Sequence, residues 1–232
     1  TVALVATQPP TVDVVARRVH DLRRLIADLR GDEHAVRIVA VTKTFDVVAW
    51  ATARDAGCDA VGENYAQEFL DKVGRTGGPA PLPVHFVGHL QSNKVKALAL
   101  HVALWHTVDR ESIVTALAKE AERLGAAPHV LLQVNSTAEA QKSGCAPGDV
   151  GRLLAAAEAA GLIVDGLMTM GPSDADPAAT RVAFNLTARL AADHGVRELS
   201  MGMTHDVRIA IEEGSTIVRV GTGIFGERPR SD

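Results

Sequence analysis

Short apolar runs recur along the chain, and longer segments of mixed polarity separate them. Each run is rich in β-branched residues and is almost continuously hydrophobic, without the alternation of a half-exposed strand. Strands that are buried on both faces, as in parallel sheets, have this pattern. The eight runs are Val36–Thr42, Cys58–Glu63, Val84–Gly88, Leu104–Val108, His129–Asn135, Ile163–Met170, Glu198–Met203 and Ile217–Gly221.

The segments between the runs have the features of helices. Apolar residues recur at steps of three and four, and several of these segments end at a glycine. One further helix precedes the first run, where an apolar stripe extends from Val12 to Leu29. Aspartates stand where helix N-caps are expected. The predicted N-caps are Asp46, Asp109 and Asp176.

Eight alternations of strand and helix predict a single closed (β/α)8 barrel of the TIM type, with an extra N-terminal helix, over residues 1–232. The alternative is an open, doubly wound sheet. The barrel is favoured because eight strands suffice to close it, and because no glycine-rich dinucleotide-binding motif follows the first run. No linker divides the chain.

Composition narrows the class of protein. Hydrophobic residues make up 47% and charged residues 22%, as in ordinary globular domains. The net charge of −4 and the 3% of aromatic residues argue against a nucleic-acid surface. No apolar stretch reaches membrane-spanning length, so a cytoplasmic location without membrane contact is expected. Cys58 and Cys145 are expected to be reduced thiols, the histidines have no metal-ligand spacing, and His85 is expected to be a hydrogen-bonded core residue.

Lys43 is the most informative residue at a predicted strand end. It directly follows the first apolar run, and active sites of such barrels lie at the C-terminal ends of the strands. One interpretation is an ordinary surface lysine whose stem packs on the protein. The other is a partly desolvated amine that attacks an aldehyde and forms an imine.

The last two predicted loops carry hydroxyl groups and glycines. Loops after strands seven and eight often bind phosphate in this fold, through hydroxyls and unobstructed backbone N–H groups. The alternative is structural, with glycines in tight turns and Thr204 capping the next helix, and the two interpretations are compatible. The residues are Ser200, Gly202, Thr204, Gly221, Thr222 and Gly223.

Arg219 lies within the eighth run, two residues before Gly221. By the strand period both side chains share a face, which aims the arginine into the barrel, where it needs a partner. That partner is either a carboxylate, Glu63 or Asp206, or a ring nitrogen of a ligand. Asn64 follows the second run and is expected to bond either a ligand or the loop backbone.

Five motifs, in this order, resemble the pyridoxal phosphate homeostasis proteins, a family related to the N-terminal barrel domain of alanine racemases. The resemblance covers nearly the whole chain, and the ordered set is far more specific than any one motif. The motifs are Val41-Thr42-Lys43-Thr44, Gly62-Glu63-Asn64-Tyr65, the run His85–Lys94, Ser200-Met201-Gly202-Met203 and Val218-Arg219-Val220-Gly221-Thr222.

The resemblance implies a site for pyridoxal 5'-phosphate (PLP) with Lys43 as its Schiff-base lysine. It also implies that Arg219 faces the pyridine nitrogen and that Asn64 lies near the ring. Ser200, Thr204, Gly221 and Thr222 match the phosphate-binding residues. Thr204 departs from the usual serine but keeps the hydroxyl, and the roles of the neighbouring His205 and of Lys142, which matches a lysine at the barrel mouth, stay open.

Three functions compete at this point. The favoured one is a monomeric, non-catalytic protein that stores, buffers or delivers PLP, with apo-enzymes or amino acids as partners. The alternative is a small PLP-dependent amino-acid racemase, which needs acid–base groups on both faces of the α-carbon. Related racemases take the second group from a tyrosine of a C-terminal β-domain. That domain is expected to be absent, because the chain ends soon after the eighth strand and its one tyrosine is Tyr65.

Arg219 further favours the carrier. A guanidinium only donates hydrogen bonds, so a pyridine nitrogen beside it stays unprotonated and withdraws electrons weakly. The third candidate is a lysine-dependent aldolase on the same fold, which would bind a substrate phosphate in the same loops. It would be colourless, whereas a protein with PLP on a lysine is yellow.

Overall fold

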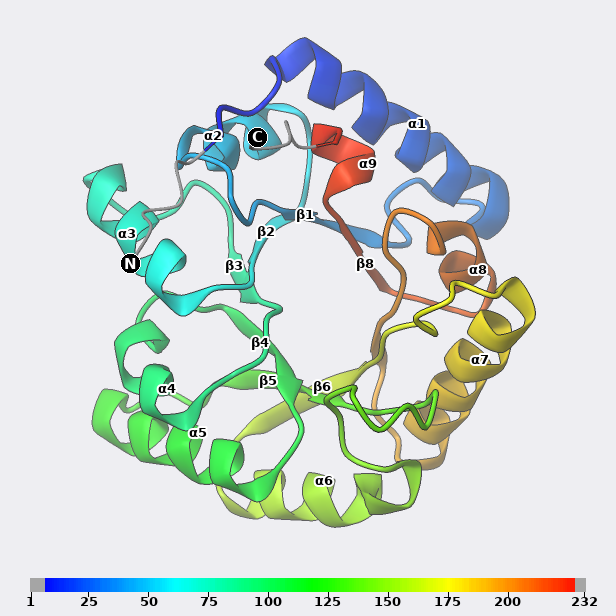
Figure 1. Ribbon diagram of the computed structural model, residues 1–232. Coiled ribbons are helices and arrows are strands. Elements are labelled where there is room, and N and C mark those ends of the chain that lie inside the picture. The colour runs from blue at the N-terminus through cyan, green and yellow to red at the C-terminus, as the bar shows by residue number, and fades with distance from the viewer. Residues whose placement is uncertain (1–6, 228–232) are drawn as a thin grey trace.

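Eight parallel strands close into a barrel in the computed structural model, which describes residues 7–227 (Figure 1). Each strand pairs with the next one in the chain, and β8 pairs with β1. The predicted (β/α)8 barrel is therefore confirmed, and the open sheet is excluded. The strands are β1 (Arg37–Val41), β2 (Ala60–Glu63), β3 (Val84–Phe86), β4 (Leu104–Val108), β5 (His129–Gln133), β6 (Ile163–Met168), β7 (Glu198–Ser200) and β8 (Ile217–Val220).

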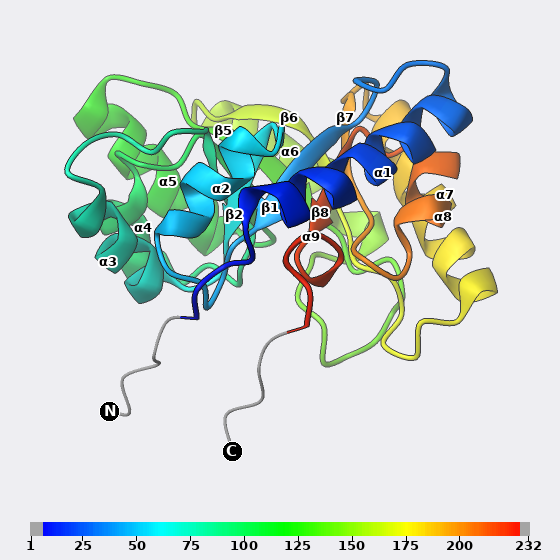
Figure 2. The same ribbon diagram turned by 90° about the horizontal axis from the view of Figure 1, so that it is seen from above.

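Helices surround the barrel as an outer layer (Figures 1 and 2). The extra N-terminal helix is confirmed as α1, which buries Val15, Val19 and Ile26 and packs against α2, α8 and α9. The helices are α1 (Val12–Arg30), α2 (Val48–Asp55), α3 (Ala66–Thr76), α4 (Ser92–Leu98), α5 (Glu111–Leu124), the 3-10 turn η1 (Pro147–Asp149), α6 (Val150–Ala159), α7 (Pro177–Asp193), α8 (Val207–Glu212) and α9 (Thr222–Phe225).

Several strands are shorter than the predicted runs. The run Glu198–Met203 contributes only the three residues of β7, because Gly202 has a φ of 95° and leaves the extended conformation. The polar residues after the shortened strands thus belong to the loops at the C-terminal mouth of the barrel, where the predicted site residues lie.

The predicted helix caps are only partly confirmed. The Asp176 carboxylate caps α7 and accepts a 2.7 Å hydrogen bond from Ala179 N. Asp46 stands two residues before α2 and accepts a 3.3 Å bond from the first backbone N–H of that helix. The prediction for Asp109 is wrong. Arg110 is the N-cap of α5, and the Asp109 carboxylate accepts a 2.5 Å bond from the Arg110 guanidinium instead.

Three expectations about the whole chain can be compared with the described part. Cys58 and Cys145 are both buried and form no disulfide. Within residues 7–227 no three His, Cys, Asp or Glu side chains are grouped as metal ligands, and no helix there is long and apolar enough to cross a bilayer. Residues 1–6 and 228–232, which the predicted domain includes, lie outside the described part.

The β7–β8 junction depends on one buried hydroxyl. The two strands share a single registered pair, Ser200 with Ile217. The Ser215 Oγ lies 3.0, 2.8 and 2.9 Å from the carbonyl oxygens of Leu199, Met201 and Ile217. It therefore links the ends of both strands where the backbone ladder is short.

We expect Ser215→Ala to lower the free energy of unfolding by about 1–3 kcal/mol, because the buried Met201 carbonyl, which lies nearest the hydroxyl, loses this donor. Urea unfolding followed by circular dichroism measures the change. Thr115→Ala is the matched control, since the exposed Thr115 hydroxyl bonds only its own helix and its loss should change stability by less than about 0.5 kcal/mol. Equal effects of the two substitutions would contradict the role of Ser215.

Candidate functional site

A pocket of about 240 Å³ lies at the C-terminal mouth of the barrel, where β1 meets β8. The closure of the barrel brings the loop after β1 beside the loops after β7 and β8. Five of the predicted site residues therefore meet here, although they are far apart in the sequence. The lining residues are Val41, Lys43, Phe45, Met203, Thr204, His205, Arg219, Gly221, Thr222 and Gly226.

One corner of the pocket gathers hydroxyl and N–H groups. Thr204 Oγ1 lies 3.0 Å from Thr222 Oγ1 and accepts a 2.9 Å hydrogen bond from Gly223 N. Thr204 does not cap the next helix, which was the structural interpretation of this residue, because the N-cap of α8 is Asp206. The Thr204 hydroxyl has turned toward the β8 loop instead, and the cluster can bind an anion.

The glycine at position 223 leaves room for this cluster. A Cβ there would lie 2.8 Å from the side chain of Val220 and 3.2–3.3 Å from that of Thr204. Any larger residue would therefore displace the Val220 side chain and crowd that of Thr204. Small residues and hydroxyls in this corner suit a phosphate group, which needs several converging donors and close approach to the backbone.

Among residues 7–227, the Arg219 guanidinium bonds neutral oxygens and forms no salt bridge with a carboxylate. Its Nη1 donates to Ser200 O at 2.7 Å and to Ser200 Oγ at 2.5 Å, and its Nη2 donates to Thr169 O at 3.0 Å. The expected salt bridge with Glu63 or Asp206 does not form. These bonds leave two of the five guanidinium N–H groups for a ligand. Burial lowers the pKa of Arg219 to about 10, so the guanidinium remains charged at neutral pH.

Ser200 lies inside the barrel, beneath Arg219, and does not line the pocket. Since its Oγ accepts from Arg219, its hydroxyl donates to His106 Nδ1 at 2.9 Å, and His106 Nε2 donates to His85 Nδ1 at 3.0 Å. Burial lowers the pKa of His85 to about 4 and holds the pKa of His106 well below its usual value, so both rings are neutral. His85 is thus a hydrogen-bonded core residue, as predicted, and the structure places Ser200 as a support for Arg219.

The roles of His106 and Thr169 as hydrogen-bond partners of Ser200 and Arg219 were not predicted from the sequence. The signal available for His106 was a titratable side chain inside the apolar run Leu104–Val108. The carbonyl of Thr169 leaves no such signal, because every residue has one.

Asn64 lies after β2, outside the residues that line the pocket. Its buried Oδ1 has no hydrogen-bond partner among residues 7–227. Its backbone packs tightly on the next strand end, since a Cβ on Gly88 would lie 1.9 Å from Asn64 O. A buried acceptor without a donor is rare in proteins. The Asn64 Oδ1 atom is therefore suited to accept a hydrogen bond from a ligand.

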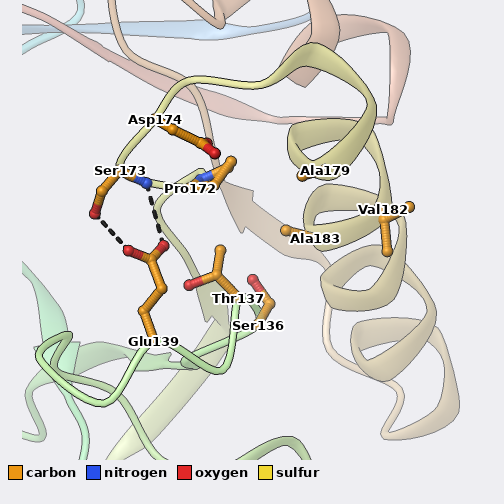
Figure 3. Close-up of a pocket in the computed structure, with 9 residues that line it drawn as sticks. All are labelled: Ser136, Thr137, Glu139, Pro172, Ser173, Asp174, Ala179, Val182 and Ala183. Atoms are coloured by element: carbon orange, nitrogen blue, oxygen red, sulfur yellow. Dashed lines mark hydrogen bonds between the residues drawn. The ribbon is translucent and has the colours of Figure 1, made fainter.

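A second, larger hollow of about 630 Å³ lies between the loops after β5 and β6 and α7 (Figure 3). None of the predicted cofactor-binding residues lines it. Its Glu139 carboxylate accepts from Ser173 N and Oγ, at 3.1 and 2.5 Å. Lys142 donates to Glu139 Oε1 and Gly171 O, both at 2.5 Å. Lys142 is therefore held in these loops, whereas Lys43, Thr204 and Thr222 line the smaller pocket.

The family model "Alanine racemase, N-terminal domain" matches residues 16–229 of the chain. The pyridoxal phosphate homeostasis protein of Pseudomonas aeruginosa is 42% identical over 201 residues, which cover 85% of this chain and 86% of that protein. The chain belongs to the family of pyridoxal phosphate homeostasis proteins. The protein of the same name from Escherichia coli K12 is 37% identical over 204 residues, which cover 84% of this chain and 87% of that family member.

Solved structures agree with this assignment to the family. PipY of Synechococcus elongatus, solved with PLP bound, superposes with a TM-score of 0.79 at 32% identity and covers 91% of this chain and 100% of its own. An unknown protein from Bifidobacterium adolescentis has a TM-score of 0.84 at 32% identity, covering 95% and 99%. Alanine racemase of Clostridium difficile, at 14% identity and a TM-score of 0.70, shares the fold and covers 93% of this chain and 58% of its own.

Proposed function

We propose that this protein binds PLP in the pocket between β1 and β8 and acts in PLP homeostasis, storing, buffering or delivering the cofactor. Lys43 is the amine that forms the Schiff base with the cofactor aldehyde. The observation that carries the proposal is that Lys43 lines the same pocket as the hydroxyls of Thr204 and Thr222. Relatives of similar length carry this function in their names, and PipY was solved with PLP bound.

Each end of the pocket has a separate task in this proposal. Thr204, Thr222 and the backbone around Gly221 and Gly223 bind the phosphate. Arg219 donates a hydrogen bond to the ring nitrogen from a guanidinium that Ser200 holds in place. When bound, PLP supplies an aldehyde that amines capture reversibly and a ring that withdraws electrons.

Two features of the site favour a carrier over a racemase. Arg219 donates hydrogen bonds but keeps its protons, so it does not protonate the ring nitrogen. A ring with an unprotonated nitrogen stabilises a carbanion poorly. Tyr65, the one tyrosine of the chain, is 53% exposed and does not line the pocket. We therefore propose a cytoplasmic, monomeric carrier whose partners are PLP-dependent apo-enzymes or free amino acids that remove the cofactor from Lys43.

The test of the carrier proposal is the exchange of the α-proton of L-alanine in heavy water, in the presence of the PLP-loaded protein. We expect exchange and racemisation well below about 1 per second, which is already low for an enzyme, because Tyr65 does not line the pocket and a ring beside Arg219 stabilises a carbanion poorly. Proton NMR and chiral chromatography measure the two rates. Turnover at or above that rate would overturn the carrier proposal, and Tyr65→Phe would then test the tyrosine. A colourless protein that does not bind PLP would instead favour the aldolase.

A further inference from the structure

A buried ionic network lies behind the β1 loop that carries Lys43. The Lys72 ammonium lies 2.7 Å from Glu63 Oε1 and 2.8 Å from Glu68 Oε1. Lys72 is 3% exposed and Glu63 is fully buried. Glu63 ends β2, and Glu68 and Lys72 lie one turn apart on α3. None of the three side chains lines the pocket, so the site described above does not use them.

The network holds the backbone on both sides of Lys43. On the preceding side, Lys72 Nζ donates to Thr42 O at 2.8 Å, and Thr42 Oγ1 donates to Glu63 Oε1 at 2.6 Å. On the following side, Thr44 N donates to Glu68 Oε1 at 2.5 Å. Lys43 is thus the central residue of a three-residue segment, and each end of this segment is hydrogen-bonded to members of the same ionic network.

The segment has a backbone conformation that needs such support. Thr44 has a φ of 70°, in the left-handed region that β-branched residues rarely occupy. The bond from Thr44 N to Glu68 stabilises this conformation, and the turn closes with Phe45 N donating to Thr42 O at 3.1 Å. Strained residues of this kind persist where the surroundings hold them, and they cluster at functional sites.

The network is also costly for a purely structural element. Burial raises the pKa of Glu63, while Lys72, Thr42 and Trp50 lower it through their contacts. The second oxygen, Oε2, has no hydrogen-bond partner within the described chain. Apolar residues of similar volume often stabilise a core as well as a buried ion pair does. We therefore infer that these charged side chains fix the conformation of the loop around Lys43 more than they stabilise the core.

We propose that Glu63, Glu68 and Lys72 are positioning residues for Lys43, and that they set the rate at which its amine captures the PLP aldehyde. This inference rests on the proposed function. In the reaction the uncharged Nζ bonds to the aldehyde carbon, the aldehyde oxygen leaves as water, and no further reagent is needed. Because the network does not reach the phosphate corner, its loss should slow the covalent step without weakening the binding of a phosphate ester that has no aldehyde.

The test compares two ligands on cofactor-free protein with Glu68→Ala. Glu68 is the partly exposed member of the network, with a side chain 22% accessible. When it is removed, Lys72 is still paired with Glu63, so no uncompensated charge is left in the core. Mixing with PLP, followed by visible absorbance, gives the rate of Schiff-base formation, which we expect to fall about tenfold or more, the effect of a misplaced reacting group. Calorimetry with pyridoxine 5'-phosphate, which cannot form a Schiff base, should give an unchanged affinity.

Two further variants separate positioning from general damage. Glu68→Gln keeps the oxygen that accepts from Thr44 N, so it should restore most of the rate. Glu212→Ala removes a similarly accessible glutamate, 29% exposed, that pairs with Arg181 on the outer helices, and it should react at the wild-type rate. Equal rates for wild type and Glu68→Ala would overturn the inference, as would a parallel loss of PLP rate and pyridoxine 5'-phosphate affinity. Wild-type protein that forms no Schiff base would refute the proposed function itself.

Discussion

Lys43→Ala is expected to abolish the covalent attachment of PLP. Lys43 lines the pocket together with the groups assigned to the phosphate, and within residues 7–227 it is the one lysine in that lining. The purified variant mixed with PLP should lack the visible absorbance of the bound cofactor. After borohydride reduction, mass spectrometry of the intact protein should show no added cofactor mass, whereas wild type should show one per chain.

Two lysine variants are the controls for this experiment. Lys43→Arg keeps the positive charge but cannot form the Schiff base, so it should also lack the cofactor mass. Lys142→Ala should retain it, because Lys142 bonds Glu139 and Gly171 in the loops after β5 and β6. If Lys43→Ala still traps one cofactor per chain, the assignment of Lys43 is wrong, and peptide mapping would examine Lys142 first.

Thr222→Ala is expected to weaken PLP binding by about tenfold or more. Hydrogen bonds to a charged phosphate are worth roughly 1.5–3 kcal/mol each, and this substitution also removes the hydroxyl that lies 3.0 Å from Thr204 Oγ1. For the same reason pyridoxal, which lacks the phosphate, should bind much more weakly than PLP. Titration followed by visible absorbance gives both dissociation constants.

The control for Thr222→Ala is the same change at Thr137, which lines the second hollow (Figure 3). This variant should bind PLP with wild-type affinity. Equal affinities for pyridoxal and PLP would show that the hydroxyl cluster is not a phosphate site. The same conclusion would follow if Thr137→Ala weakened binding as much as Thr222→Ala does.

The sequence pattern was enough to predict the barrel and the inward direction of the Arg219 side chain. Near-continuous apolar runs mark strands that are buried on both sides, and the strand period aimed Arg219 into the barrel. The strand period does not predict which side chains of neighbouring strands lie at the same level in the barrel as Arg219. The carboxylates suggested as partners of Arg219 are engaged elsewhere, Glu63 by Lys72 and Asp206 by the backbone of Met203. Arg219 instead uses neutral oxygens of the adjacent strand ends.

The wrong predictions concern competition between polar groups. Asp109 is a suitable cap by residue type, but the side chain of the next residue, Arg110, takes its carboxylate. Thr204 is a suitable cap as well, but Gly223 N donates to its hydroxyl across the barrel mouth. Residue type tells what a side chain can bond, and only the tertiary fold decides which partner is near. The Lys72 network could not be predicted for the same reason, since it joins a strand end, a helix and a loop.

The position of the pocket at the β1–β8 junction has a consequence for the order of events during synthesis. Lys43 leaves the ribosome early, whereas Arg219 and Thr222 follow more than three quarters of the sequence later. Until β8 pairs with β1, a growing chain has the reactive amine but neither the guanidinium nor the hydroxyl that complete the pocket. In the proposed carrier, an unfinished chain therefore cannot retain the cofactor, and cofactor retention would report that the last strand has entered the barrel.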